Sequence, residues 1–122
     1  MEIEFIDDNN FSKNLKKYYK KYLSIYNDLE IFKQVLKDRY KSENINNIIS
    51  KHTNILIEQD NIYIIKDRLM SKSLKGSSMR IIHIYQKSCN KVIFLELYYK
   101  GDKENENREL YQNKLKEILK KN

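Results

Sequence analysis

The chain has 122 residues, enough for one domain around a single hydrophobic core and too few for two. Its hydrophobic content of 40% argues against a disordered protein, although 34% of the residues are charged and the formal net charge is +7. One cysteine excludes an internal disulfide, and we see neither a membrane-spanning apolar run nor a signal peptide, so we expect a cytoplasmic protein without a membrane partner. Because proline is absent and only two glycines occur, no flexible linker is visible, and we expect residues 1–122 to form a single domain.

The first forty residues predict one strand followed by a helical hairpin. Met1–Ile6 alternates, with Ile3 and Phe5 on one side, as in a short strand. Apolar residues then recur twice at helical spacing, which predicts two amphipathic helices. They are Phe11, Leu15, Tyr18 or Tyr19, and Tyr22 in the first helix, and Leu29, Phe32, Leu36 and Tyr40, with Val35, in the second. We expect the second helix to begin at Asn27, which forms a capping-box pattern with Glu30.

Residues 41–61 have the weakest pattern. Ile45, Ile48 and Ile49 have the spacing of one short helix, and Ile55–Ile57 is compatible with an extended segment. We therefore expect a connecting region of undetermined structure here.

The second half predicts three strands and a final helix. β-branched and aromatic residues are concentrated in Ile62–Leu69, Met79–Gln86 and Lys91–Tyr99, and a turn at residues 87–90 joins the last two strands. The helix is expected from Asn105 to Lys120, and acidic residues in its first turns would complement the helix dipole: Glu104, Glu106 and Glu109. The predicted fold class is α+β, in which the N-terminal strand and the helical hairpin pack on a mostly antiparallel meander with a C-terminal helix.

Positive charge is concentrated in the predicted sheet. Residues 62–103 contain nine lysines and arginines but three acidic residues, whereas the other 80 residues contain 15 basic and 14 acidic side chains. This window thus holds +6 of the net charge of +7. A sheet with such a field is suited to a polyanion, of which RNA and DNA are the commonest.

Three segments of this region have recognisable motifs, in order, behind the predicted helical hairpin. They are a K-x-R strand at residues 65–69, a Gly/Ser loop leading into an arginine-aliphatic-aliphatic strand at residues 76–85, and an aliphatic strand ending Y-x-K within residues 94–105. These segments and the order of the elements together resemble the RelE/ParE superfamily of bacterial toxins, and the resemblance covers most of the chain.

The resemblance to the RelE-like branch implies the toxin of a type II toxin–antitoxin system, a ribosome-dependent mRNA endonuclease that inhibits translation. In that reaction the 2′-OH of the substrate attacks the adjacent phosphate without a metal. The attack needs a base, cations around the phosphorane and an acid for the leaving 5′-oxygen. The implied partners are a cognate antitoxin protein, the ribosome and mRNA. The sequence contains neither a Cys/His metal pattern nor a P-loop, so we expect no cofactor.

The resemblance also implies site residues. Lys66 and Arg68 match the K-x-R strand and share one face by the strand period of two. Arg80 matches the arginine that enters the next strand, and Lys100 matches the basic end of the last strand, two residues after Tyr98. We expect the catalytic residues to converge on one sheet face: Lys66, Arg80, Tyr98 and Lys100. The expected RNA-binding residues are Arg68, Lys72, Lys75 and Lys103.

For each of three polar residues, both a functional and a purely structural interpretation remain open. Glu96 shares a face with Tyr98 and could act as a base, but an ion pair with Arg80 or Lys100 is the simpler interpretation. His83 has the opposite strand parity to Arg80, which favours a packed histidine over a catalytic one. His52 falls in the region of weak pattern, and the same structural interpretation applies to it.

Two other functions fit the same residues. A ParE-like protein of this fold would poison DNA gyrase through protein contacts and cleave nothing. A non-catalytic basic module would bind ribosomal or other RNA. Basic residues on three strands at once favour the endonuclease, because a purely protein-binding relative has no chemical need for them.

Overall fold

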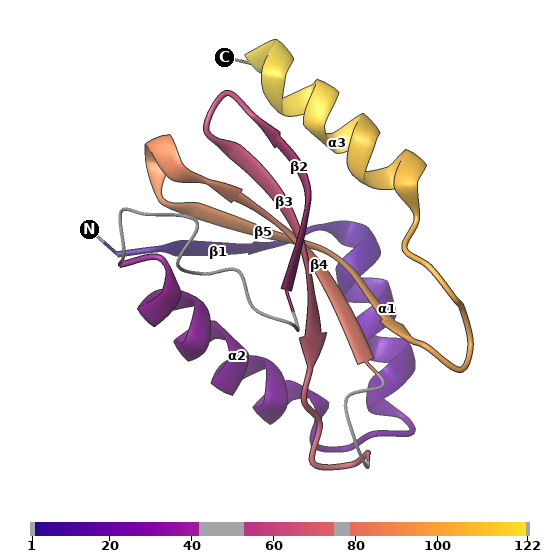
Figure 1. The fold of residues 1–122 in the computed structure, drawn as a ribbon. Helices are drawn as coiled ribbons and strands as arrows, with labels where there is room; N and C mark the ends of the chain where they lie inside the picture. Colours follow the sequence, from indigo (N-terminus) through magenta and orange to yellow (C-terminus); the bar gives the residue numbers. More distant parts are fainter. Residues whose placement is uncertain (1, 42–52, 75–78, 122) are drawn as a thin grey trace.

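The computed structural model describes residues 2–41, 53–74 and 79–121, and it has the expected α+β fold (Figure 1). A five-stranded sheet carries helices on both faces. The elements are β1 (Glu4–Asp7), α1 (Asn9–Tyr19), α2 (Ile25–Arg39), β2 (Thr53–Gln59), β3 (Ile62–Leu69), β4 (Met79–Gln86), a 3-10 turn (Lys87–Cys89), β5 (Lys91–Tyr99) and α3 (Arg108–Lys121). None of the helices in the described ranges has the length and apolar character needed to cross a membrane.

The strand order of the sheet is β1-β5-β4-β3-β2. β1 runs parallel to β5, and every other neighbouring pair is antiparallel. The three predicted strands have the predicted bounds, and β2 extends the sheet where only Ile55–Ile57 was expected to be extended. Its turn into β3 consists of Asp60 and Asn61, both with positive φ, a backbone conformation that aspartate and asparagine tolerate better than most residues.

Helices α1 and α2 lie on one face of the sheet and α3 on the other (Figure 1). The sheet separates two hydrophobic clusters, one under each helical layer. Tyr63 and Ile65 of β3 pack toward α1 and α2, whereas Ile62 and Ile64 pack toward α3. Because both faces are covered over this part of the sheet, the strands are nearly continuous apolar runs instead of alternating ones. Most of the predicted apolar residues of the two N-terminal helices are buried in the cluster on the α1 and α2 side, while Val35 is exposed. The buried ones are Phe11, Leu15, Tyr18, Leu29, Phe32, Leu36 and Tyr40.

Two helix starts differ from the sequence-based expectation. α2 begins at Ile25 after the N-cap residue Ser24, so Asn27 lies inside the helix and the predicted capping box is wrong. The Ser24 hydroxyl donates to Asp28 at 2.8 Å and lies 2.7 Å from the hydroxyl of Ser73, a contact that fixes the helix start from a distant loop. α3 begins at Arg108, three residues later than predicted. The helix suggested by Ile45, Ile48 and Ile49 lies outside the described residues.

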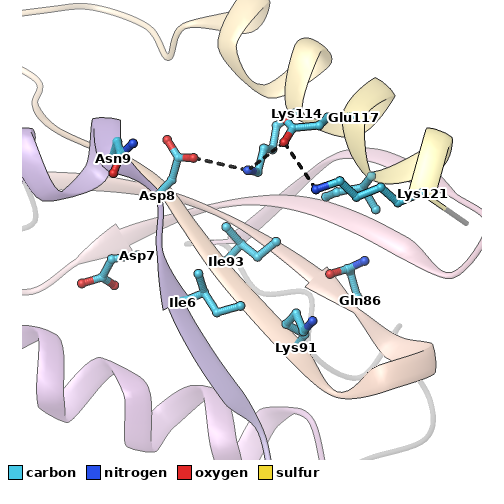
Figure 2. A pocket seen from close by; sticks show the side chains of 11 residues that line it. Ile6, Asp7, Asp8, Asn9, Gln86, Lys91, Ile93, Lys114, Glu117 and Lys121 are labelled. Carbon is cyan, nitrogen blue, oxygen red and sulfur yellow. Dashed lines mark ion pairs between the residues drawn. The ribbon is translucent and has the colours of Figure 1, made fainter.

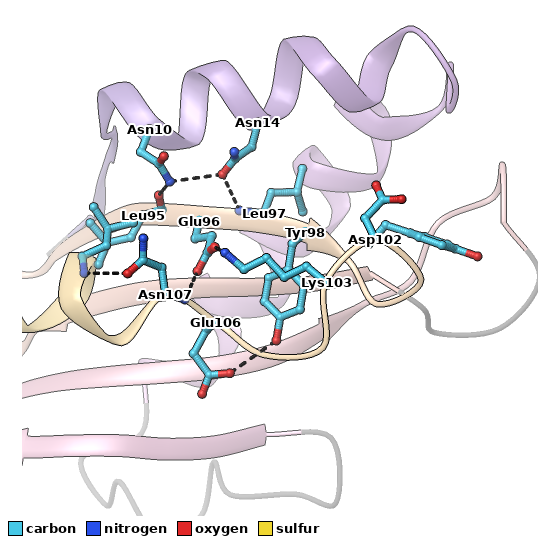
Figure 3. Close-up of polar contacts among 12 residues, drawn as sticks. Asn10, Asn14, Leu95, Glu96, Leu97, Tyr98, Asp102, Lys103, Glu106 and Asn107 are labelled. Atoms are coloured by element: carbon cyan, nitrogen blue, oxygen red, sulfur yellow. Dashed lines mark hydrogen bonds and ion pairs between the residues drawn. The ribbon is translucent and has the colours of Figure 1, made fainter.

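α1 completes the sheet edge where β1 ends. The last paired residue of β1 is Asp7, opposite Phe94, so the second half of β5 has no strand on that side. Polar side chains of α1, spaced four residues apart, instead bind backbone groups of β5 spaced two apart. Figure 3 shows the contacts of Asn10 and Asn14. Asn10 donates to the carbonyl of Leu95 at 2.9 Å, Asn14 accepts from the amide of Leu97 at 3.0 Å, and Tyr18 accepts from the amide of Tyr99 at 3.0 Å. The helix therefore satisfies the backbone that a strand would otherwise pair.

Candidate functional site

The candidate site lies on the α3 side of the sheet, where β3 ends, β4 begins and β5 ends. α3 packs on the apolar part of this face, which includes Ile64, Ile84 and Ile93. Beyond that part the face becomes polar, and residues 100–107, between β5 and α3, contact it (Figure 3). We call the side chains gathered here the polar cluster: Lys66, Arg68, Arg80, Glu96, Tyr98, Lys103 and Glu106.

Strand register brings the predicted residues of the strands together. Arg68, Arg80 and Tyr98 are direct partners across β3, β4 and β5. Lys66 stands opposite Ile82, which packs under α3, so Lys66 and Arg68 lie on the α3 face. Cross-strand partners have their side chains on the same face. Lys66 and Arg80 therefore share one face, as expected.

Arg80 is the buried cation of this row. Its residue is 7% exposed, and its guanidinium donates to the carbonyl of Met79 at 3.1 Å. Burial, and after it the positive charge of Arg68, lowers the pKa of Arg80. Two guanidinium groups on directly paired residues create a local field that favours an anion.

Tyr98 and Lys66 meet at Glu106. The Glu106 carboxylate accepts from the ammonium of Lys66 at 3.0 Å. It also accepts from the phenol of Tyr98 at 3.4 Å (Figure 3). Burial alone would raise the pKa of Glu106, but hydrogen bonds from its own backbone amide and from Lys66 hold it below the usual value. Burial, and then the charge of Glu106, raises the pKa of Tyr98, so this phenol keeps its proton at neutral pH.

Glu96 holds the segment that follows β5. Its residue is 4% exposed, and its carboxylate forms an ion pair with Lys103 and accepts from the backbone amide of Asn107 at 2.8 Å (Figure 3). Lys103 also lies over the ring of Tyr98, 5.6 Å from its centroid. An ion pair was the simpler expectation for Glu96, but its partner here is Lys103, which was predicted to bind RNA.

The remaining predicted residues lie apart from this row. Lys100 is exposed in the turn after the last residue of β5, outside the strand register that unites Arg80 and Tyr98. Lys72 follows β3, and its backbone amide donates to Asp28 of α2 at 3.3 Å, which ties its loop to the helical hairpin. Lys75 lies outside the described residues.

The buried histidine belongs to the opposite face. His83 is 0% exposed, and its Nε2 lies 2.6 Å from the hydroxyl of Tyr40. Its Nδ1 lies 3.7 Å from Asp67, beyond hydrogen-bond distance. Asp67 receives two hydrogen bonds from Arg39, at 2.9 and 3.0 Å. The packed interpretation of His83 is confirmed, while His52 lies outside the described residues.

A pocket lies at the other end of the α3 face, away from the polar cluster. This pocket of about 430 Å³ is bordered by β1, β5 and α3, and its lining includes Ile118. Figure 2 shows Ile6 and Ile93 among the other lining residues. Its lining charges include both signs, and Lys114 pairs with Asp8 at 3.4 Å and with Glu117 at 3.8 Å. We assign the candidate site to the polar cluster and not to this pocket, because the cluster holds two adjacent guanidinium groups.

Sequence reasoning missed Glu106 as a member of the site. It was assigned to the first turn of the final helix, yet it precedes α3 and its carboxylate contacts β3 and β5. No periodic signal could have revealed this, because the contact depends on the path of an irregular segment. Among the described residues, no group of three or more His, Cys, Asp or Glu side chains is placed to hold a metal ion.

Comparisons of the chain with models of protein families, with curated proteins and with solved structures found no match.

Proposed function

We propose that this chain is the toxin component of a type II toxin–antitoxin system and that it cleaves mRNA on the ribosome. The observation that carries the proposal is the row Arg68–Arg80–Tyr98, with Lys66 beside it, on one face of a sheet. A rigid sheet holds these groups in place before substrate binds, which is the condition for electrostatic stabilisation of a transition state.

The proposed reaction uses the substrate's own 2′-OH as the nucleophile. This hydroxyl loses its proton to a base, forms a bond to the adjacent phosphorus, and the bond from phosphorus to the 5′-oxygen breaks. Arg80 and Lys66 stabilise the negative charge of the phosphorane, and the planar guanidinium offers two parallel donors to it. Tyr98 retains its proton and is the donor we assign to the leaving 5′-oxygen. The products are a 2′,3′-cyclic phosphate and a 5′-hydroxyl.

The small area of the polar cluster supports a division of labour with the ribosome. The cluster supplies cations and donors for one phosphate, but it has little surface for reading bases. We therefore propose that the ribosome places the mRNA, that a cognate antitoxin keeps the toxin inactive, and that the protein acts in the cytoplasm.

Regulated expression in bacteria tests this proposal against the two alternatives. We expect growth arrest, with reporter mRNA cut within codons only while it is translated, as measured by primer extension. Growth arrest with intact mRNA and trapped DNA gyrase would instead identify the gyrase poison of the same fold. Absence of arrest, together with tight RNA binding by the purified protein, would identify the non-catalytic RNA-binding module.

A further inference from the structure

Glu106 places a negative charge inside the cationic part of the polar cluster. Its side chain is 14% exposed, and the carboxylate lies 3.0 Å from the Lys66 ammonium and 3.4 Å from the Tyr98 phenol. Lys66 and Tyr98 come from β3 and β5, while Arg80 lies on β4 between these strands and is the direct partner of Tyr98. The carboxylate thus occupies a position at which an RNA phosphate would meet Lys66 and Tyr98.

The two acids of the polar cluster are held differently. Glu96 projects from the regular strand β5 and is engaged by Lys103 and by the backbone amide of Asn107. These contacts fasten residues 103–107 to the sheet. Glu106 lies between the two fastened residues, and its carboxylate is held by Lys66, by Tyr98 and by its own backbone amide. Rotation of its side chain alone would break its contacts with both groups, without release of the segment or of α3.

A carboxylate and a phosphodiester compete directly for such groups. Both are anions whose oxygens accept hydrogen bonds from ammonium and phenol donors. Two anions cannot occupy the position together, because like charges in a partly buried site repel strongly. RNA that reaches Lys66 must therefore displace the carboxylate.

We propose that Glu106 is an internal substitute for the RNA phosphate, and that RNA binding displaces its side chain while Glu96 keeps the segment in place. This inference rests on the proposed function for the identity of the ligand as RNA. It assigns Lys66 and Tyr98 to a phosphate-binding subsite that the chain itself closes when no RNA is bound. Glu106 is then an inhibitory residue and not a catalytic one.

Binding of RNA to the full chain tests the inference. The probe is a short fluorescein-labelled oligonucleotide with 2′-O-methyl riboses, which cannot be cleaved by 2′-OH attack, and the readout is fluorescence anisotropy at low salt. We expect Glu106→Gln to tighten binding roughly tenfold, which corresponds to about 1.4 kcal/mol. The matched control is Glu104→Gln, an exposed residue of the same segment with the same change in net charge, and its effect should be small.

A second background shows whether the effect acts through Lys66. In Lys66→Ala protein, Glu106→Gln should no longer tighten binding, because the cation for which the two anions compete is absent. If Glu104→Gln and Glu106→Gln tighten oligonucleotide binding equally, the effect comes from the change in net charge alone, and the inference is overturned. Weaker binding by Glu106→Gln would overturn it as well.

Cleavage in translation extracts separates this inference from the proposed function. Glu106→Gln should cleave mRNA at least as fast as the wild-type chain. Loss of cleavage with unchanged binding would make Glu106 the base of the reaction and overturn the inference. If no variant cleaves, yet Glu106→Gln binds the oligonucleotide more tightly, the proposed endonuclease activity is wrong. The inference that RNA displaces the Glu106 carboxylate is then retained.

Discussion

The side chain of Asn14 accepts a hydrogen bond from the backbone amide of Leu97 at 3.0 Å, and so joins α1 to the strand that carries Tyr98. One helical turn away on either side, Asn10 donates to the carbonyl of Leu95 and Tyr18 accepts from the amide of Tyr99. Four helical residues advance about 6 Å and two strand residues about 6.7 Å, so the two repeats stay nearly in step over three contacts. This match holds the second half of β5 on the side where no strand pairs with it, opposite to its pairing with β4.

Replacing Asn14 tests that contact. Asn14→Leu keeps the size of the side chain but leaves the Leu97 amide without its acceptor, and we expect the free energy of unfolding to fall by about 1–3 kcal/mol. Urea denaturation measures this loss, and hydrogen exchange should show faster exchange of the Leu97 amide. The matched control is Asn27→Leu, at an exposed position of α2, where the same substitution should change stability little. Equal effects at both positions would contradict the role of Asn14.

Arg80 should dominate the proposed activity. Arg80→Ala removes the buried guanidinium, and we expect ribosome-dependent mRNA cleavage to fall by a factor on the order of 10²–10³. Arg80→Lys should restore little, because an ammonium lacks the planar pair of donors. Primer extension on a reporter mRNA measures cleavage, and circular dichroism checks the fold.

Two further variants calibrate the Arg80 result. Lys100→Ala should lose less activity than Arg80→Ala, because Lys100 lies in the turn beyond the cross-strand row. Lys20→Ala removes one exposed cation of the α1 side and should cleave like the wild-type chain. If Arg80→Ala cleaves mRNA as fast as the wild-type chain does, the assignment of the site to the row Arg68–Arg80–Tyr98 is wrong.

His83 should make the fold sensitive to acid. Burial lowers the pKa of His83 to about 4, against about 6.5 in an unfolded chain. The unfolded state therefore binds more protons within this interval, so the stability contributed by neutral His83 is present above pH about 6.5 and lost as the pH falls toward 4. The expected loss is at most about 1.4 kcal/mol per pH unit.

A variant without a titrating group isolates this contribution. His83→Gln retains an acceptor for Tyr40, and its free energy of unfolding should depend less steeply on pH between about 6.5 and 4.5 than that of the wild-type chain. Urea denaturation across this range gives both curves, and the carboxylates common to both proteins cancel in the difference. Parallel curves would show that His83 does not titrate as assigned.

The sequence by itself determined the strands and the packed helical faces. Three strands have the predicted bounds, because dense runs of β-branched and aromatic residues leave few alternatives to a buried strand. They are Ile62–Leu69, Met79–Gln86 and Lys91–Tyr99. The apolar repeats of α1 and α2 were equally clear, since a period near 3.6 marks one buried face. β2 was only partly foreseen, because its turn uses Asp60 and Asn61 without a glycine.

Only the tertiary structure decided which side chains meet at the site. An extra residue, Leu95, interrupts the pairing of β5 with β4, since Ile82 stands opposite Glu96 while His83 stands opposite Phe94. Strict alternation would place Tyr98 on the same face as Phe94, which packs against α1 and α2; the bulge places it beside Arg80 on the other face. The positions of Glu106 and Lys103 likewise depend on the irregular path after β5. Periodicity determines local structure, but a bulge and a connecting segment are fixed by packing and by distant hydrogen bonds, which one sequence does not display.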